Sequence, residues 1–266
     1  MKLKNSYKTI EFELRKKSII IWLNRPEVHN AFNRDMMTEL LELLNDIEND
    51  DNIRSIIISG RGRSFSAGAD LKWMRETINY SMEKNLSESK LISDLFNKIY
   101  TFRKPVISAI NGAAIGGGMG FVAASDIVIA SKSATFGLSE VRIGLIPSII
   151  STYLLRKSTG GKLKELFITG RRFGPEIAFD TGLVNEIVED DRLINEAMKR
   201  ADELELAGPD AIAACKELFE KIPDMNLEEA SDFTARLLAN LRVGDEAQEG
   251  MKSFLEKRNP NWKKPD

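Results

Sequence analysis

The chain is predicted to fold as an α/β protein with a mainly parallel sheet, followed by a helical region. Short apolar strands recur near Ile56, Val106, Ile127 and Val184, and helical patterns separate them. This alternation is typical of βα units around a parallel sheet. From Asp190 onward the strand patterns stop, and amphipathic helices follow. A chain of 266 residues with 42% hydrophobic content is long and apolar enough to bury a large core.

The first fifty residues predict a hairpin and a helix. Residues 9–14 alternate in strand fashion and residues 18–23 form an apolar run, with residues 15–17 as the turn between them. The stretch 35–47 then has apolar residues at helical spacing, which predicts one buried helix face. That face consists of Met36, Leu40, Leu43, Leu44 and Ile47. Four C-terminal helices are predicted over residues 194–206, 209–221, 227–241 and 245–257.

Two loops of small residues follow buried strands. The first is the stretch 66–70, SAGAD, and the second contains the glycine triplet 116–118. Glycine allows the backbone to approach a ligand closely, and the first N–H groups of a helix have no acceptor inside it. Each loop therefore offers one N–H to an oxyanion, as in sites that stabilise enolates and tetrahedral intermediates. For the glycine triplet taken alone, a tight strand-to-helix connection without chemistry is the alternative.

Charge and composition exclude several classes of protein. The net charge of −2 gives no electrostatic footprint for nucleic acid. No stretch approaches the ~20 apolar residues of a membrane span, and the first residues lack the apolar segment of a secretory signal, so a cytoplasmic protein is predicted. No His/Cys/Asp spacing indicates a metal, and neither a dinucleotide fingerprint nor a P-loop lysine accompanies the glycines. The single cysteine, Cys215, excludes an internal disulfide and is predicted to pack in a helix.

Four segments together resemble the crotonase, or enoyl-CoA hydratase/isomerase, superfamily. They are the stretch 24–33, the stretch 65–71, Asn111-Gly112 with the triplet 116–118, and the stretch 136–140 with 144–147. These segments occur in the family's order and at its spacing, and they cover nearly the whole chain. The resemblance implies a crotonase-like ββα superhelical core over residues 1–190. It also implies a C-terminal helical region over residues 191–266 that packs against neighbouring subunits in a homotrimer or homohexamer.

The resemblance also implies a set of site residues. The two oxyanion donors would be the N–H groups of Ala69 and Gly117, holding the enolate of an acyl-CoA thioester, and Glu140 matches the second catalytic glutamate of hydratases. Coenzyme A is then part of the substrate and no separate cofactor is implied. The substrate-binding residues carried over are Arg25, Val28, His29, Ala67, Gly68, Lys72, Gly116 and Gly120, together with Lys257 and Trp262, which would reach the coenzyme A of a neighbouring subunit. Surface or tail packing is the alternative for Lys257 and Trp262, and a Ser-His-Asp hydrolase is the alternative for His29.

The chain departs from the best-known hydratases at Gly120, where those enzymes carry their first glutamate. Glu140 would then deprotonate water and pass that proton to Cα, or shuttle a proton between Cα and Cγ, which is isomerisation. Sequence around the site looks most like bacterial methylglutaconyl-CoA hydratases of leucine breakdown, which resemble this chain in having glycine there. The missing side chain at Gly120 is predicted to leave room for a branched or carboxylated acyl group.

Hydration is favoured by the resemblance to methylglutaconyl-CoA hydratases and by the missing side chain at Gly120. Double-bond isomerisation is the main alternative, followed by other enolate chemistry such as C–C cleavage or thioester hydrolysis. A non-catalytic paralogue that binds coenzyme A or RNA is the alternative from another class. Intact Ala69, Gly117 and Glu140 argue against that paralogue, and no clustered basic face supports RNA binding.

Overall fold

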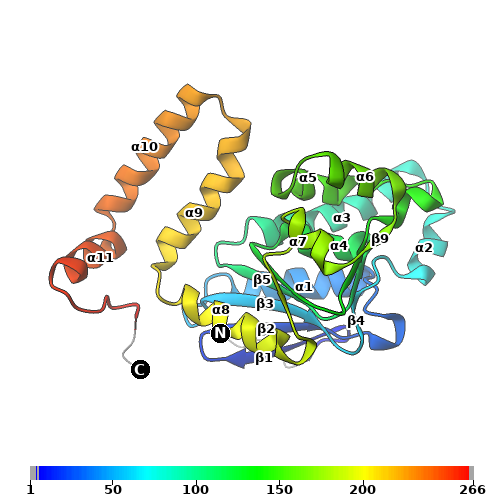
Figure 1. The fold of residues 1–266 in the computed structure, drawn as a ribbon, viewed down its shortest axis with the longest axis horizontal. Coiled ribbons are helices and arrows are strands. Elements are labelled where there is room, and N and C mark those ends of the chain that lie inside the picture. The colour runs from blue at the N-terminus through cyan, green and yellow to red at the C-terminus, as the bar shows by residue number, and fades with distance from the viewer. Residues whose placement is uncertain (1–3, 5, 264–266) are drawn as a thin grey trace.

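A six-stranded sheet forms the centre of the fold (Figure 1). The computed structural model describes residues 4 and 6–263. The sheet has the order β1-β2-β3-β5-β7-β10, and β1 is antiparallel to β2 whereas the other neighbours are parallel. Its strands are β1 (Ile10–Arg15), β2 (Ser18–Leu23), β3 (Ser55–Gly60), β5 (Val106–Ile110), β7 (Ile127–Ser131) and β10 (Glu186–Val188). The predicted α/β class and hairpin are confirmed, and the last strand begins at Glu186 instead of around Val184.

The central strands are mostly apolar and largely buried, because both faces of the sheet are covered. Ile20, Ile57 and Ile107 lie in register on adjacent strands and pack against helix α8 (Leu193–Leu204). Their strand neighbours Ile19 and Ile56 point to the opposite face and enter the larger core. Burial on both faces explains the continuous apolar runs of the sequence. Helix α8 therefore belongs to the core, although it lies beyond residue 190.

Helices cover the other face of the sheet. The predicted apolar face of α1 (Arg34–Ile47) is confirmed, because all five of its residues are fully buried: Met36, Leu40, Leu43, Leu44 and Ile47. Asn33 begins this helix, because its side chain accepts the N–H of Met36 at 3.0 Å. The helices that follow α1 and precede α8 are α2 (Leu71–Thr77), α3 (Met82–Tyr100), α4 (Met119–Ala124), α5 (Ser148–Lys157), α6 (Gly161–Thr169) and α7 (Pro175–Asp180).

A second, four-stranded sheet has the order β4-β6-β8-β9. Its strands are β4 (Ser64–Ser66), β6 (Ala113–Ile115), β8 (Thr135–Gly137) and β9 (Arg172–Phe173). Strands β4, β6 and β8 are parallel, and β9 is antiparallel to β8. Short 3-10 helices lie at η1 (Pro26–Val28), η2 (Gly116–Gly118), η3 (Ser139–Ile143), η4 (Asp190–Arg192) and η5 (Ile222–Asp224). Because the three parallel strands share a direction, their carboxyl ends meet at one edge.

Helices α9 (Pro209–Lys221), α10 (Leu227–Val243) and α11 (Asp245–Leu255) form an arm that projects from the core (Figure 1). With α8 they confirm the four predicted C-terminal helices. The arm leaves large apolar side chains in contact with solvent: Leu227 is 88% exposed, Phe254 82% and Val243 80%. Cys215 of α9 is also exposed, so the prediction that it packs is wrong for the single chain, because no element covers that face of the helix.

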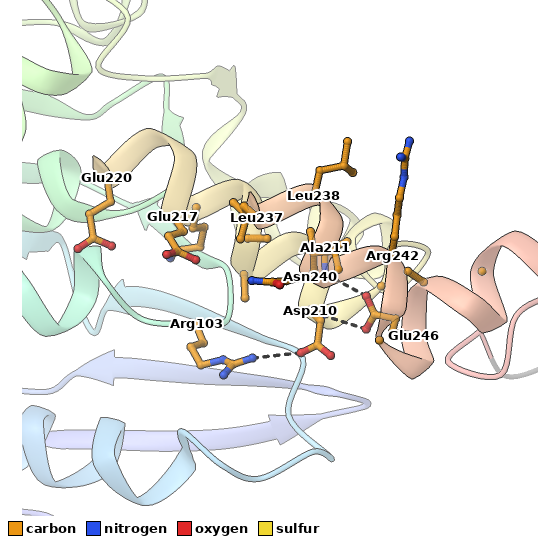
Figure 2. A pocket seen from close by; sticks show the side chains of 18 of the residues that line it. Arg103, Asp210, Ala211, Glu217, Glu220, Leu237, Leu238, Asn240, Arg242 and Glu246 are labelled. Carbon is orange, nitrogen blue, oxygen red and sulfur yellow. Dashed lines mark hydrogen bonds and ion pairs between the residues drawn. The ribbon is translucent and has the colours of Figure 1, made fainter. Parts of the chain in front are cut away.

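A groove of about 940 Å³ lies between this arm and the segment that follows α3. Figure 2 shows that Arg103 pairs with Asp210 across it, at 3.1 Å. The Glu246 carboxylate accepts the N–H groups of Asp210 and Ala211, each at 2.9 Å, and so joins the start of α9 to α11. The described residues that line the groove include Trp262, which is predicted to reach the coenzyme A of a neighbouring subunit, but neither glycine loop nor Glu140, so the groove is separate from the predicted catalytic centre.

Residues 4 and 6–263 contain neither a membrane-spanning helix nor a cluster of metal ligands. No helix there has both the length and the hydropathy to cross a membrane. No group of three or more His, Cys, Asp or Glu side chains is placed to hold a metal ion. The sequence prediction about a secretory signal rests partly on residues 1–3 and 5, which lie outside the described residues.

Candidate active site

Three predicted site residues follow three adjacent strands of the small sheet. Strand β4 leads into the loop with Ala69, β6 into the triplet with Gly117, and β8 into η3 with Glu140. The register pairs Ser66 with Ala114 and Ile115 with Gly137, so the ends of the strands lie side by side. The topology thereby brings together Ala69 and Glu140, which are 71 residues apart in the sequence.

The two glycine loops touch each other. A Cβ on Gly68 would lie 2.7 Å from the Ile115 carbonyl oxygen and 3.2 Å from the Gly117 nitrogen. Gly68 also has φ of +88°, a conformation that other residues rarely adopt. Gly117 is the second residue of the helical turn η2, where N–H groups have no intrahelical acceptor. Within the described residues, the Ala69 N–H likewise donates to no recorded acceptor.

Glu140 lies against the second loop. Its Oε1 would be 3.6 Å from a Cβ placed on Gly116, so the carboxylate borders the triplet. Its Oε2 is buried and has no hydrogen-bond partner among the described residues. Burial raises the pKa of this carboxyl above its ordinary value, and a hydrogen bond from its own backbone N–H only partly opposes the rise. A buried carboxylate with an unused oxygen is suited to take and return a proton.

Arg25, whose contact with coenzyme A stays a prediction, has two partners within the protein. Its Nη2 pairs with Asp70 at 2.7 Å and its Nη1 donates to the Ala31 carbonyl at 2.5 Å. Asp70 in turn begins α2 by accepting the Lys72 N–H at 2.7 Å. Burial opposes the charge on Asp70, but Arg25 and the helix amides outweigh it and hold the pKa below its usual value. The Arg25–Asp70 pair therefore braces the first oxyanion loop.

His29 contacts the site loop through its backbone and ring. Its carbonyl accepts the Ala67 N–H at 2.9 Å. Its Nδ1 lies 2.9 Å from Ser64 Oγ, while Nε2 lies 3.2 Å from a guanidinium nitrogen of Arg63. Because a guanidinium only donates, Nε2 accepts and Nδ1 carries the proton. A hydrolytic triad needs a carboxylate where Arg63 stands, so this arrangement disfavours the hydrolase alternative.

The predicted free space at Gly120 does not exist, which corrects the interpretation of that residue. Gly120 is buried in α4, and a Cβ placed there would overlap the ring of Phe96 from α3. The ring of Phe96 packs edge-to-face on Phe121 at 5.3 Å and on Phe32 at 6.5 Å. The space beside the Gly120 α-carbon is therefore filled by a phenyl ring of the chain itself.

The remaining predicted residues fall into two groups. Val28 is half-buried in η1, and Lys72 is exposed at the start of α2. Lys257 and Trp262 follow α11, and within the described residues no hydrogen bond joins them to the loops of this site; the Trp262 carbonyl instead accepts from Lys17 Nζ at 3.3 Å. Trp262 packs on Gly250, and its indole N–H donates to the Leu206 carbonyl at 3.3 Å. A role at coenzyme A for these two residues stays a prediction.

Several residues that shape the site had no assigned role in the sequence interpretation. Asn30 is buried, and its amide donates to the carbonyls of Arg61 and Ser64 at 2.8 and 2.7 Å. Asp70 had a usable signal, since Asp directly before a helical pattern is typical of an N-cap. Phe96 had none, because its contact with Gly120 joins two different helices.

The assembled groups suit chemistry on an acyl thioester. Two backbone N–H groups at adjacent loop ends can hold a carbonyl oxygen that gains negative charge. One carboxylate beside them can move a proton to or from the carbon next to that carbonyl. Asp70, the carboxylate next to Ala69 in the first loop, is held by Arg25 at 2.7 Å.

Comparisons with known proteins agree with this geometry. A family model described as enoyl-CoA hydratase/isomerase matches residues 15–265. A putative enoyl-CoA hydratase of Thermus thermophilus is 35% identical over 91% of this chain and 96% of its own length. A short-chain-enoyl-CoA hydratase of Clostridium acetobutylicum is 32% identical over 91% of this chain and 92% of its own.

Solved structures with a similar fold are also enoyl-CoA hydratases or isomerases by name. An enoyl-CoA hydratase of Shewanella pealeana superposes with a TM-score of 0.92 at 33% identity, covering 96% of both chains. A putative enoyl-CoA hydratase/isomerase (crotonase) of Legionella pneumophila has a TM-score of 0.88 at 39% identity, covering 97% of this chain and all of that one. The predicted crotonase resemblance is confirmed. The chain belongs to the enoyl-CoA hydratase/isomerase family.

Proposed function

We propose that this protein is a hydro-lyase that adds water across the conjugated double bond of an enoyl-CoA thioester. The observation that carries the proposal is that Ala69, Gly117 and Glu140 follow the carboxyl ends of three adjacent parallel strands, β4, β6 and β8. The names of the Thermus and Clostridium relatives, both hydratases, support it. Coenzyme A enters as the carrier part of the substrate.

In this mechanism Glu140 performs both proton transfers. Its carboxylate takes a proton from water as the water oxygen bonds to Cβ, and the electron pair of the double bond moves into the thioester carbonyl. The Ala69 and Gly117 N–H groups stabilise the resulting enolate oxygen. Glu140 then returns the proton to Cα, which restores the carbonyl. The buried Oε2 supports this dual role, because no hydrogen bond from the described residues occupies it.

The acyl group is proposed on sequence resemblance alone. Methylglutaconyl-CoA remains the favoured candidate because the sequence around Ala69 and Gly120 resembles hydratases of that substrate. The ring of Phe96 removes the argument from free volume at Gly120. The test is therefore a direct comparison of crotonyl-CoA, 3-methylcrotonyl-CoA and 3-methylglutaconyl-CoA, each followed by the loss of conjugated thioester absorbance.

Product analysis distinguishes hydration from isomerisation with a single glutamate. Hydration yields a 3-hydroxyacyl-CoA, whereas isomerisation yields a β,γ-enoyl-CoA without uptake of water, and NMR of the product separates them. We expect the 3-hydroxy product, with kcat reduced by about 10²-fold or more in Glu140→Gln. A β,γ-enoyl product, or unchanged absorbance with all three substrates, would overturn the proposal.

The arm is proposed to be covered by neighbouring copies of the same chain in a homotrimer or homohexamer. Helix α10 has no buried residue within the single chain, and α9 has only Ala214. Exposed residues such as Phe219 (78%) and Leu255 (79%) are typical of a surface that another protein covers. Light scattering coupled to size-exclusion chromatography measures the assembly directly, and a monomer at micromolar concentration would contradict the proposal.

A further inference from the structure

One buried residue, Phe32, contacts both loops that carry the oxyanion donors. Its exposed fraction is 2%. Its backbone N–H donates to the Gly68 carbonyl at 2.8 Å, and its own carbonyl accepts the Asp70 N–H at 2.9 Å. These two bonds form an isolated parallel bridge between Phe32 and Ala69. The two hydrogen bonds thus hold the residues on both sides of Ala69, Gly68 and Asp70.

The bridge fixes the direction of the first donor. The Gly68 carbonyl and the Ala69 N–H belong to one peptide unit, which is planar and trans, so they point in opposite directions. Because the Gly68 carbonyl points at Phe32, the Ala69 N–H must point away from it. The Ala69 N–H is therefore held outward without any side chain of its own taking part.

The ring of Phe32 supports the second donor. A Cβ on Gly117 would overlap this ring, so the phenyl group lies directly against the Gly117 α-carbon. The ring is itself held by Trp73, with centroids 6.1 Å apart, and by Phe96, with centroids 6.5 Å apart. The main chain of one residue therefore orients Ala69, and its side chain buttresses Gly117.

We propose that Phe32 is a positioning residue that sets the spacing of the two oxyanion donors. The proposal rests on the proposed function, because it assigns Phe32 to the same thioester carbonyl. The backbone and the side chain of Phe32 then have different roles. Substitution of the side chain keeps the backbone bridge, so the Ala69 N–H keeps its position. A smaller side chain allows the Gly117 N–H to shift. Misplacement of a catalytic group by about 1 Å costs roughly 10²-fold in rate.

The experiment compares Phe32→Leu and Phe32→Ala with the control Phe102→Leu in the full-length protein. Phe102 is also fully buried, but it follows α3, and it is not among the described residues that lie against Gly68 or Gly117. Turnover of the best enoyl-CoA gives kcat and KM. Difference infrared spectroscopy of bound butyryl-CoA, which cannot be hydrated, reports how strongly the donors polarise the thioester carbonyl. Urea unfolding establishes that each variant is folded.

We expect kcat to fall about 10²-fold in Phe32→Ala and about tenfold in Phe32→Leu, with butyryl-CoA affinity within threefold of wild type. The carbonyl stretch should move toward its frequency in free butyryl-CoA in the same order, and Phe102→Leu should change neither quantity. If Phe32→Leu retains the wild-type kcat and carbonyl frequency, the proposal is wrong while the proposed function stands. If wild-type protein neither polarises butyryl-CoA nor turns over an enoyl-CoA, the proposed function itself fails.

Discussion

The edge that carries the site and the C-terminal arm are built in opposite ways. At the edge, Phe32 and Phe96 fill the space beside Gly117 and Gly120, so the loops are packed from behind. In the arm, α10 buries no residue, and polar contacts such as the exposed Arg103–Asp210 pair join α9 to the core. Exposed pairs of this kind contribute roughly 0–1 kcal/mol each. One chain therefore suffices to form the donors and Glu140, whereas the arm lacks a covering surface.

The largest effect on function is expected for Glu140→Gln at the packed edge. Gln keeps the shape of the side chain but cannot accept and return a proton, so kcat should fall by about 10²-fold or more. Affinity for butyryl-CoA should remain, since the Ala69 and Gly117 N–H groups are untouched. Steady-state kinetics and calorimetric binding measure the two quantities. Turnover near the wild-type rate would remove Glu140 from the mechanism.

The same variant has a pH-dependent effect on stability. Burial raises the folded-state pKa of Glu140 above its unfolded value, so the charged form is disfavoured in the folded protein. The stability linked to this group is thus fully present below the unfolded pKa and is lost as pH rises through the folded pKa. Glu140→Gln should therefore unfold at a higher temperature than wild type at pH 7, and the difference should shrink at about pH 4. A constant difference across this range would contradict the assigned cause.

A second effect is expected from Gly120→Glu, which forces a side chain against the ring of Phe96. Overpacking and burial of a carboxyl group should lower the free energy of unfolding by roughly 3 kcal/mol. Adding Phe96→Ala should cost less in this variant than in wild type, because the smaller residue makes room for the new side chain. Urea unfolding of the four proteins gives the coupling energy. Additive effects would show that the ring and Gly120 do not constrain each other.

The smallest effect on the folding of one chain is expected for Phe254→Ser in the arm. Its side chain is 82% exposed, so the change should alter the unfolding free energy of the separated chain by no more than about 0.5 kcal/mol. The proposed assembly should nevertheless weaken, and light scattering at decreasing concentration measures this. Leu14→Ser is the matched control, since Leu14 is an exposed leucine of β1 outside the arm. Equal masses for both variants at every concentration would argue against an interface at Phe254.

The sequence was sufficient for the strands and helices with strong periodicity, and the family motif placed Glu140 beside the glycine triplet. It did not reveal strands β4, β6 and β8, because segments of three residues are too short to show a period. The prediction of free space beside Gly120 was wrong, because the ring of Phe96, from another helix, fills that space. Local patterns encode local structure, and contacts between distant segments leave no comparable signal.

The assembly of the site from three separate strands has a consequence for folding. Ala69, Gly117 and Glu140 become neighbours only after β4, β6 and β8 have paired, and these pairings join segments far apart in the chain. Contacts of long sequence separation form slowly because the intervening loops must first be closed. Helices such as α1 and α3 contain mainly local bonds and do not depend on those pairings. Recovered enzymatic turnover therefore reports completed long-range pairing, whereas recovered helical signal does not.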